Sequence, residues 1–334
     1  FPACSGSQDK ASDERGKFDV NADYSDILKQ AKGTTVNFYG WGGDEQRNKW
    51  LDTVVAPALK DKYDITLERV PMDIDQILAK LSGEKQAGSD EGSIDMIWIN
   101  GENFYSAKEN GLLFGPFAGK LPNYQKYIDA DAEENQKDFG YPIEGYEAPY
   151  GKAEMVMIND SAATPETPKN TAELLDYVKK YPGKVTYPAL PDFTGSAFVR
   201  NIIYDIVGYE QFMNMEADKA TVKAAIEPAL AYLRSLNPYL WNQGKSFPSS
   251  SNDVNNMFSD GELYMTMSYE PYTIAVNIEQ GTFSETARSY LFDSGMIGNT
   301  NYIAIAANSP HKAAAMVAIN EILSAEMQAS QFSE

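Results

Sequence analysis

The sequence predicts an α/β protein made of two successive units, and three observations support this fold class. A β-α-β-α-β order occupies residues 35–99, and a second series of helices and strands follows from residue 153. The chain has 334 residues, enough for two domains of about 100–200 residues each. No period of roughly 20–50 residues repeats, which excludes solenoids and propellers.

The first unit contains three predicted strands and two predicted helices. Alternating or apolar runs predict strands over 35–39, 65–70 and 94–99. Apolar residues at helical spacing predict helices over 50–59 and 74–81. Because strands alternate with helices, we expect a parallel sheet with right-handed crossovers.

The second series begins after a segment rich in Pro, Gly and Tyr at 141–151, a composition typical of a crossing between domains. The predicted strands cover 153–158, 185–187, 263–268 and 302–306. The predicted helices cover 174–178, 194–206, 221–236, 252–258 and 310–323.

Charge and composition exclude several classes of protein. Lys plus Arg is 28 and Asp plus Glu is 48, so the formal net charge is 28 − 48 = −20. Such a chain lacks the basic footprint of a nucleic-acid binder and does not adhere to anionic lipid through its surface. No apolar run approaches the ~18 residues that a membrane-spanning helix needs. With one Cys and one His, neither a disulfide framework nor a Cys/His metal site is expected.

Two polar features have simple interpretations. His311 follows a proline at a predicted helix start, and we expect it to be a solvated surface residue. An acidic segment is expected to be a solvated face; it contains Asp129, Asp131, Glu133, Glu134 and Asp138.

The residues around Cys4 resemble the end of a bacterial lipoprotein signal peptide. A small residue precedes Cys4, and a Ser/Gly tract follows it. We therefore expect a signal peptide that is cleaved before a lipidated Cys4, with residues 1–32 forming a tether. The alternative is an incidental terminal Cys.

Small, polar and aromatic residues follow the predicted strands. In an open parallel sheet, ligands bind beyond the carboxyl ends of the strands. The candidate ligand-binding residues are Gly40, Trp41, Gly42, Gly43, Asn100, Gly101, Glu102, Asn103, Thr194, Gly195, Ser196, Tyr269 and Glu270. The alternatives are a tight turn with a packed Trp41 and simple helix capping at Thr194 and Ser196.

Catalytic signatures are largely absent. The GKS at 244–246 has Tyr239 where a phosphate-binding loop needs Gly. No Gly-x-Ser-x-Gly elbow occurs, and we expect no catalytic residue, metal ligand or cofactor. A pair of carboxylates running a glycosidase reaction remains an alternative.

Four motifs resemble family 1 extracellular solute-binding proteins of bacterial ABC importers, in the branch labelled uncharacterised or thiamine-like. They are IWINGENF at 97–104, APYG at 148–151, DFTGSAF at 192–198 and MSYEP at 267–271. The resemblance implies a type II periplasmic-binding-protein-like fold with a hinge between two lobes. It implies a first lobe of residues 33–148 and 300–326, a second lobe of 152–298, and a small ligand between them. It also implies a further C-terminal segment on the second lobe, beyond residue 334.

This resemblance predicts a monomeric extracytoplasmic receptor that delivers a small polar solute to an ABC permease and its ATPase. Trp41 and Tyr269 would stack on the solute. Glu102 and Glu270 would favour a cation such as thiamine, whereas free N–H groups at 194–196 would favour a phosphate. The four motifs contain no Arg or Lys, and this balance favours a cation or a neutral molecule. The alternatives are the extracellular carbohydrate-active enzyme and a sensor or adhesion domain on a lipid stalk.

Overall fold

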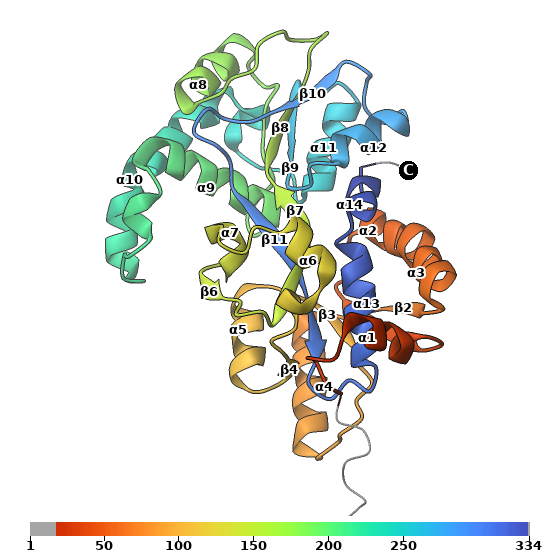
Figure 1. Ribbon diagram of the computed structural model, residues 1–334. Coiled ribbons are helices and arrows are strands. Elements are labelled where there is room, and N and C mark those ends of the chain that lie inside the picture. The colour runs from red at the N-terminus through yellow and green to blue at the C-terminus, as the bar shows by residue number, and fades with distance from the viewer. Residues whose placement is uncertain (1–17, 333–334) are drawn as a thin grey trace, which may run out of the picture. The chain divides into compact units, whose positions relative to one another are not determined.

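The computed structural model describes residues 18–332, and the chain divides into two compact units (Figure 1). Among the described residues, unit 1 comprises 18–151 and Asn301–Ser330, and unit 2 comprises Lys152–Thr300 with residues 331–332. Cys4 lies outside the described residues. No helix among residues 18–332 is long and apolar enough to cross a membrane.

Unit 1 is built on a mixed sheet with the strand order β2-β1-β3-β11-β4. Its strands are β1 Thr35–Gly40, β2 Thr66–Pro71, β3 Met96–Ile99, β4 Leu113–Phe114, β7 Glu147–Glu154 and β11 Gly298–Ala306, and β7 pairs with β11 outside the order given above. β2, β1 and β3 run parallel, which confirms the sheet predicted from residues 35–99. β11 pairs antiparallel with both β3 and β4, so the sheet as a whole is mixed.

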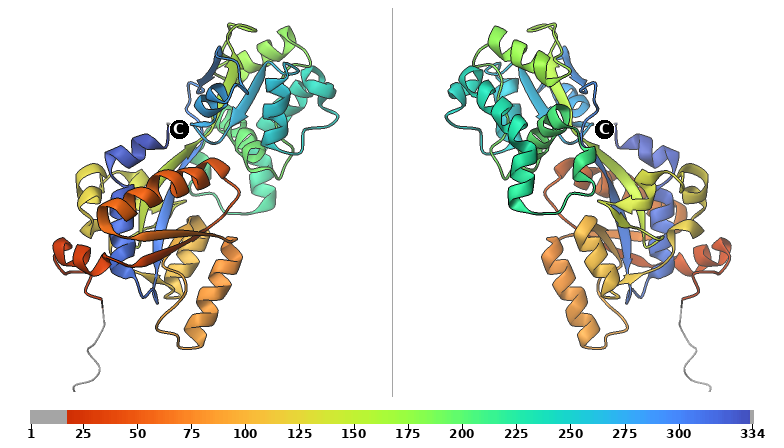
Figure 2. Two further views of the ribbon diagram at one scale, coloured as in Figure 1. Left: turned by 90° about the vertical axis from the view of Figure 1, so that its right-hand side faces the viewer. Right: turned by 90° about the vertical axis from the view of Figure 1, so that its left-hand side faces the viewer.

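Helices cover both faces of this sheet (Figure 2). The helices of unit 1 are α1 Tyr24–Ala31, α2 Glu45–Trp50, α3 Ala56–Tyr63, α4 Ile74–Gln86, α5 Gly101–Glu109, α6 Pro122–Tyr127, α7 Glu133–Gln136, α13 Lys312–Ile322 and α14 Ala325–Ser330. Phe38 and Ile303 pack with α1, α3 and α13 in one buried cluster. Tyr39 and Ala304 pack with α4 and α5 in another. Alternation along β1 and β11 therefore supplies a core to each face.

The predicted tether is too long. Residues 24–31 form α1, and Ile27 and Ala31 are buried against α13. Tyr24, Ile27, Leu28 and Ala31 follow helical spacing, so the folded body begins before residue 32.

Unit 2 contains a small antiparallel sheet with the order β10-β8-β9. Its elements are β8 Val156–Asp160, α8 Thr171–Lys180, α9 Phe193–Val207, α10 Lys219–Leu236, α11 Ser251–Ser259, β9 Met265–Ser268, α12 Thr273–Glu279 and β10 Ala287–Tyr290. β7 Glu147–Glu154 carries the chain from unit 1 into unit 2. α8, α9 and α10 pack on one face of the sheet, and α11 packs on the other.

The predicted strand over 185–187 is wrong. Val185 and Thr186 are buried, which explains their apolar and β-branched character. Their backbone makes only isolated bonds, such as the one that Trp241 N donates to Val185 O at 2.9 Å. The segment therefore has the composition of a buried strand, although no neighbouring strand pairs with it.

Candidate functional site

The two loops predicted in unit 1 emerge from the same edge of the sheet. β1 and β3 are adjacent and parallel, so the 40–43 loop and the 100–103 loop follow their neighbouring carboxyl ends. This is the edge at which open α/β sheets bind ligands.

The 40–43 loop is shaped by the Trp41 ring. A Cβ on Gly43 would lie 2.1 Å from that ring, and a Cβ on Gly42 would lie 2.6 Å from Pro71 Cβ. These glycines therefore leave room for close packing. Trp41 nevertheless remains 55% exposed.

A small hollow of about 10 Å³, enough for about one water molecule, lies beside Trp41. It is lined by Phe38, Gly40, Trp41, Asp44, Arg47, Asn48, Leu51, Arg69, Trp98 and Tyr150. The centroids of Trp41 and Trp98 are 6.2 Å apart with their planes tilted by 54°. The pocket therefore combines aromatic walls with polar groups, but its volume is far below that of a site that encloses a small molecule.

Two arginines line this pocket, and a count restricted to the four motifs missed both. Arg47 is buried, with Nε 3.5 Å from Asp44 Oδ2 and its guanidinium 5.0 Å from the centre of the Tyr150 ring. Arg69 binds Asp52 through two hydrogen bonds of 3.0 and 2.7 Å. Each arginine thus has a carboxylate neighbour, and the pocket does not carry the purely acidic balance predicted from the motifs.

Two hydrogen bonds hold the 100–103 loop, one to Asn301 and one to Asp138. Asn100 Nδ2 lies 3.4 Å from Asn301 Oδ1, so this amide contributes to the framework as well as to the edge. Gly101 begins α5 in the left-handed region at φ 57°, and its N–H donates to Asp138 Oδ2 at 2.6 Å. Glu102 is exposed and Asn103 is half-buried, so their side chains remain candidates for contact with a solute.

Asp138 contradicts the prediction of a fully solvated acidic segment. It is 1% exposed, and Glu147 is 0% exposed. Burial is the largest cause that raises the pKa of Asp138 to about 6 and holds the pKa of Glu147 well above its usual range. The other four acids of that segment are exposed, as predicted.

In unit 2 the two predicted motifs come together at Phe193 and Tyr269. Phe193 begins α9 and Tyr269 follows β9, and their rings meet edge to face with centroids 4.7 Å apart. Tyr269 is buried, and its hydroxyl donates to Asn299 Oδ1 at 2.8 Å. Burial raises the pKa of Tyr269 to about 12. Half-buried Glu270 follows, with its N–H donating to Ser268 Oγ at 3.1 Å.

Phe193, which is not among the predicted site residues, is 54% exposed, and its ring lies beside Tyr269 of this motif. In the sequence, Phe193 is marked only by its position between Asp192 and the Thr-Gly-Ser run at 194–196.

The expectation of free N–H groups at residues 194–196 is wrong for two of the three residues. Gly195 N donates to Asp192 Oδ1 at 2.9 Å, and Ser196 N donates to Asp192 O at 2.8 Å. Asp192 therefore caps α9 with its own negative charge, and this removes the argument for a bound phosphate there. Thr194 and Gly195 are buried; a Cβ on Gly195 would lie 2.2 Å from Pro188 O.

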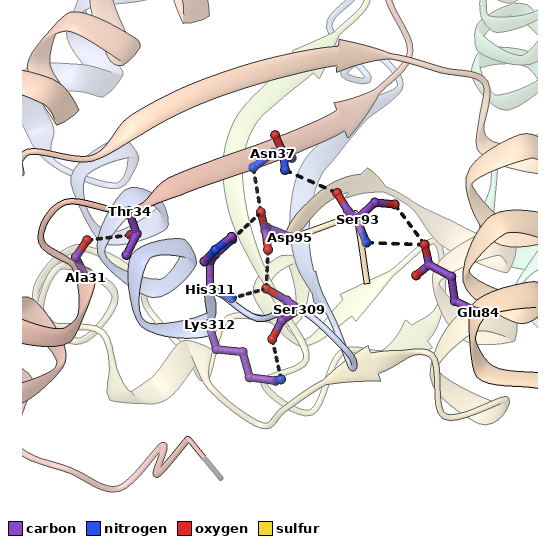
Figure 3. A network of polar contacts seen from close by, with 9 residues as sticks. All are labelled: Ala31, Thr34, Asn37, Glu84, Ser93, Asp95, Ser309, His311 and Lys312. Atoms are coloured by element: carbon purple, nitrogen blue, oxygen red, sulfur yellow. Dashed lines mark hydrogen bonds and ion pairs between the residues drawn. The ribbon is translucent and has the colours of Figure 1, made fainter. Parts of the chain in front are cut away.

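His311 is not a simple surface residue (Figure 3). Its Nδ1 lies 3.3 Å from Oδ2 of Asp95, which is 1% exposed. Asp95 also accepts from Ser309 Oγ at 2.6 Å and from Asn37 N at 2.8 Å. Because Asp95 precedes the amino end of β3, this network lies away from the edge that carries Trp41. Within residues 18–332, no group of three or more His, Cys, Asp or Glu could hold a metal ion.

Comparison with known proteins identifies the family. Residues 53–333 match the model of a family described as bacterial extracellular solute-binding protein. The chain belongs to this family. Its members bind solutes outside the cytoplasm, and this chain therefore has the extracytoplasmic role that the four motifs predicted.

Individual relatives agree with this assignment. The chain is 36% identical over 309 residues to Protein YnjB of Escherichia coli (strain K12), covering 92% of this chain and 79% of that protein. Among solved structures, the spermidine/putrescine ABC transporter substrate-binding protein PotD from Streptococcus pneumoniae matches with a TM-score of 0.62 at 13% identity, covering 88% of this chain and 79% of that one. The periplasmic binding protein AfuA from Actinobacillus pleuropneumoniae matches with a TM-score of 0.55 at 15% identity, covering 89% and 81%. These solute-binding proteins show that the chain has the two-lobe type II fold of periplasmic binding proteins.

Proposed function

We propose that this protein is the receptor of an ABC importer and delivers a small polar solute to a permease driven by an ATPase. Membership of the extracellular solute-binding family supports a binding role. PotD, an ABC transporter substrate-binding protein of the same fold, supports the partnership with a permease. The receptor acts as a monomer and makes or breaks no covalent bond.

The solute is a flat, ring-bearing molecule of the thiamine type. One observation carries this proposal: Trp41 is 55% exposed at the carboxyl end of β1, the edge at which such sheets bind ligands, next to the rings of Trp98 and Tyr150. An exposed indole face binds flat rings by stacking and cations by cation–π attraction. Phe193 offers a second exposed ring in unit 2.

The charge of the proposed solute follows from the charged side chains near the loops and from the capped start of α9. Glu102 and Glu270 favour a cation. The capped start of α9 removes the reason to expect a phosphate, because Asp192 occupies the Gly195 N–H. Unphosphorylated thiamine is therefore the preferred probe over thiamine phosphate. Arg47 and Arg69 are balanced by Asp44 and Asp52 and do not reverse this preference.

Calorimetric titration with thiamine and thiamine phosphate tests the proposal. Trp41→Ala should weaken thiamine binding by about 1–3 kcal/mol, the range expected when a stacked ring is lost, which is roughly a 5- to 150-fold rise in Kd. Tyr127→Ala is the matched control, since Tyr127 is 45% exposed in unit 1 but lies on α6, outside both loops. Absence of thiamine binding to the wild type would reject the solute; equal affinities of both variants would reject the Trp41 site.

The glycosidase alternative gains no support from the carboxylate pair that best meets its requirement. Asp138 and Glu147 have raised pKa values, as a general acid needs. Both side chains are buried, however, so a sugar cannot reach them.

Lipidation of Cys4 would hold the receptor at the outer face of the cell membrane. The small residue before Cys4 and the polar tract after it support this anchoring. The precursor expressed in bacteria should partition into membranes, and Cys4→Ala should move it to the soluble fraction. Wild-type protein that is processed but remains soluble would reject the anchor.

A further inference from the structure

We propose that Phe139, at the tip of the hairpin formed by β5 Lys137–Asp138 and β6 Tyr141–Pro142, is a specificity-determining residue whose ring stacks on a flat cationic solute. The inference rests on the proposed function in one respect, namely that a ring-bearing solute binds at the sheet edge that carries Trp41. It adds a contact from a segment that none of the four sequence motifs contains.

The backbone at the tip of this hairpin does not suit a phenylalanine. Asp138 pairs with Tyr141, so Phe139 and Gly140 form a two-residue turn. Their φ angles are 46° and 87°, and turns with two left-handed residues favour Asn-Gly or Asp-Gly. A bulky side chain in the left-handed region costs free energy that glycine and asparagine largely avoid. The turn itself therefore gives no reason for a phenylalanine at this position.

The Phe139 side chain also gains little from burial. The residue is 56% exposed, and it belongs to neither of the two buried clusters described above for unit 1. An apolar residue that is both exposed and held in a strained conformation indicates a role other than folding, because such strain is retained mainly at functional sites.

Two contacts fix the hairpin to α5, one on each side of the turn, and β6 lies beside that helix (Figure 1). Gly101 N donates to Asp138 Oδ2 at 2.6 Å. The rings of Tyr105 and Tyr141 stack with their centroids 4.7 Å apart and their planes at 18°. The tip between these contacts is therefore held in place before a solute binds, which reduces the ordering cost of binding.

The hairpin places the Phe139 ring at the ligand-binding edge of the sheet. A Cβ on Gly101, the second residue after β3, would lie 3.3 Å from this ring. Trp41 directly follows β1, the strand beside β3, and its ring packs on Gly43 in the same way. Because neighbouring strands lie about 4.8 Å apart, we expect a solute that stacks on Trp41 to reach Phe139 as well.

The charges around the ring define the class of solute. Exposed Glu102 lies in the first turn of α5, next to the glycine on which Phe139 packs. The lysines of α5 and of the hairpin, Lys108 and Lys137, each pair with a glutamate. An aromatic face close to a carboxylate attracts a flat cation and disfavours an anion. Phe139 and Glu102 should therefore select a cationic ring.

Calorimetric titration with thiamine, combined with thermal unfolding of the ligand-free protein, tests the inference. Phe139→Leu keeps an apolar side chain in the same strained turn but removes the ring. The Kd should therefore rise about 5- to 30-fold, the range of a lost cation–π contact, while the unfolding midpoint stays the same. Phe139→Tyr keeps the ring and should keep the wild-type Kd. Tyr127→Leu is the matched control, an exposed aromatic residue of unit 1 on α6, and should not change the Kd.

Phe139→Asn separates a binding role from a structural role. Asparagine suits a left-handed turn, so the midpoint of the ligand-free protein should rise by about 2–4 °C while the Kd for thiamine rises. A residue that serves the fold would show the opposite sign, with a lower midpoint for Phe139→Asn. An unchanged Kd in Phe139→Leu, or a lowered midpoint in Phe139→Asn, would overturn the inference and leave the proposed solute standing.

A second probe, N-methylnicotinamide, distinguishes failure of the inference from failure of the proposed solute. It is a flat cation that lacks the pyrimidine ring of thiamine. Binding of this probe alone, weakened in Phe139→Leu, would support the inference and reject thiamine as the solute. A wild type that binds neither compound would reject both the solute and the cation-selecting role of Phe139.

Discussion

The indole Nε1 of Trp50 donates a hydrogen bond of 2.8 Å to Ser330 Oγ, across 280 residues of sequence. Ser330 Oγ in turn donates to Met327 O at 2.7 Å, at the end of α14. This pair ties the last helix of unit 1 to α2, which follows the 40–43 loop.

Trp50→Phe should therefore lower the free energy of unfolding by about 1 kcal/mol or more, because the ring is buried and its N–H partner is lost. Urea unfolding of Trp50→Phe, Ser330→Ala and the double variant measures the coupling between the two residues. The double variant should be about 1 kcal/mol less destabilised than the sum of the single variants. Strict additivity would show that the bond contributes nothing.

Gly195→Ala should reduce stability by about 1–3 kcal/mol, the usual cost of overpacking. A Cβ there would lie 2.2 Å from the backbone oxygen of Pro188, which cannot move aside as a side-chain end can. Thermal unfolding checks this, with Gly183→Ala as a contrast: that site has space but φ 78°, so it reports backbone strain alone. An unchanged Tm for Gly195→Ala, together with lost solute binding, would assign Gly195 to the ligand surface.

Asp95→Asn should destabilise unit 1 by about 1–3 kcal/mol, because an amide cannot accept at both of its heavy atoms. Asp95 now accepts from Ser309, Asn37 and His311 on its two oxygens (Figure 3). His311→Ala should cost less than about 1 kcal/mol, since its side chain is 33% exposed and its bond is long. Equal losses in urea unfolding would make the histidine as important as the carboxylate.

Asp138 should make stability fall as the pH rises. Its pKa is about 6 in the fold against 3.8 for the ordinary group, so the folded state binds more protons between these values. The stabilisation is complete below about pH 3.8 and is lost as the pH rises through about 6. At 1.36 kcal/mol per unit this amounts to roughly 3 kcal/mol. Asp138→Asn should lack that part of the pH dependence in urea unfolding, and parallel curves for the two proteins would contradict it.

Much of the fold follows from local sequence patterns. The parallel strands β1, β2 and β3 were predictable because each is a short alternating or apolar run, and a segment with helical spacing separates each strand from the next. The segment at 185–187 misled because burial alone selects Val, Thr and Tyr, with or without a strand partner. Helix α1 was not predicted, although its apolar residues have helical spacing, because the polar residues that precede it are typical of a tether and the predicted tether ran on to residue 32.

The candidate site was predictable only where a loop follows a strand directly. Trp41 and Tyr269 satisfy that condition, whereas Arg47 reaches the pocket from α2 and Arg69 reaches it from within β2. Asp138 lies 37 residues from the Gly101 N–H that it binds. An acidic run gives no sign of which member turns inward, because that depends on how the segment around residue 138 approaches α5. Such long-range contacts leave no local spacing to detect.

The position of β11 has a consequence for the order in which the chain folds during synthesis. β11 lies between β3 and β4, yet its residues 301–306 are translated only after the whole of residues 152–300 of unit 2. A nascent chain that ends before residue 301 has an edge strand at β3 with no partner on that side. Unit 1 therefore cannot complete its sheet until residues 301–306 of β11 have been synthesised, after the whole of residues 152–300.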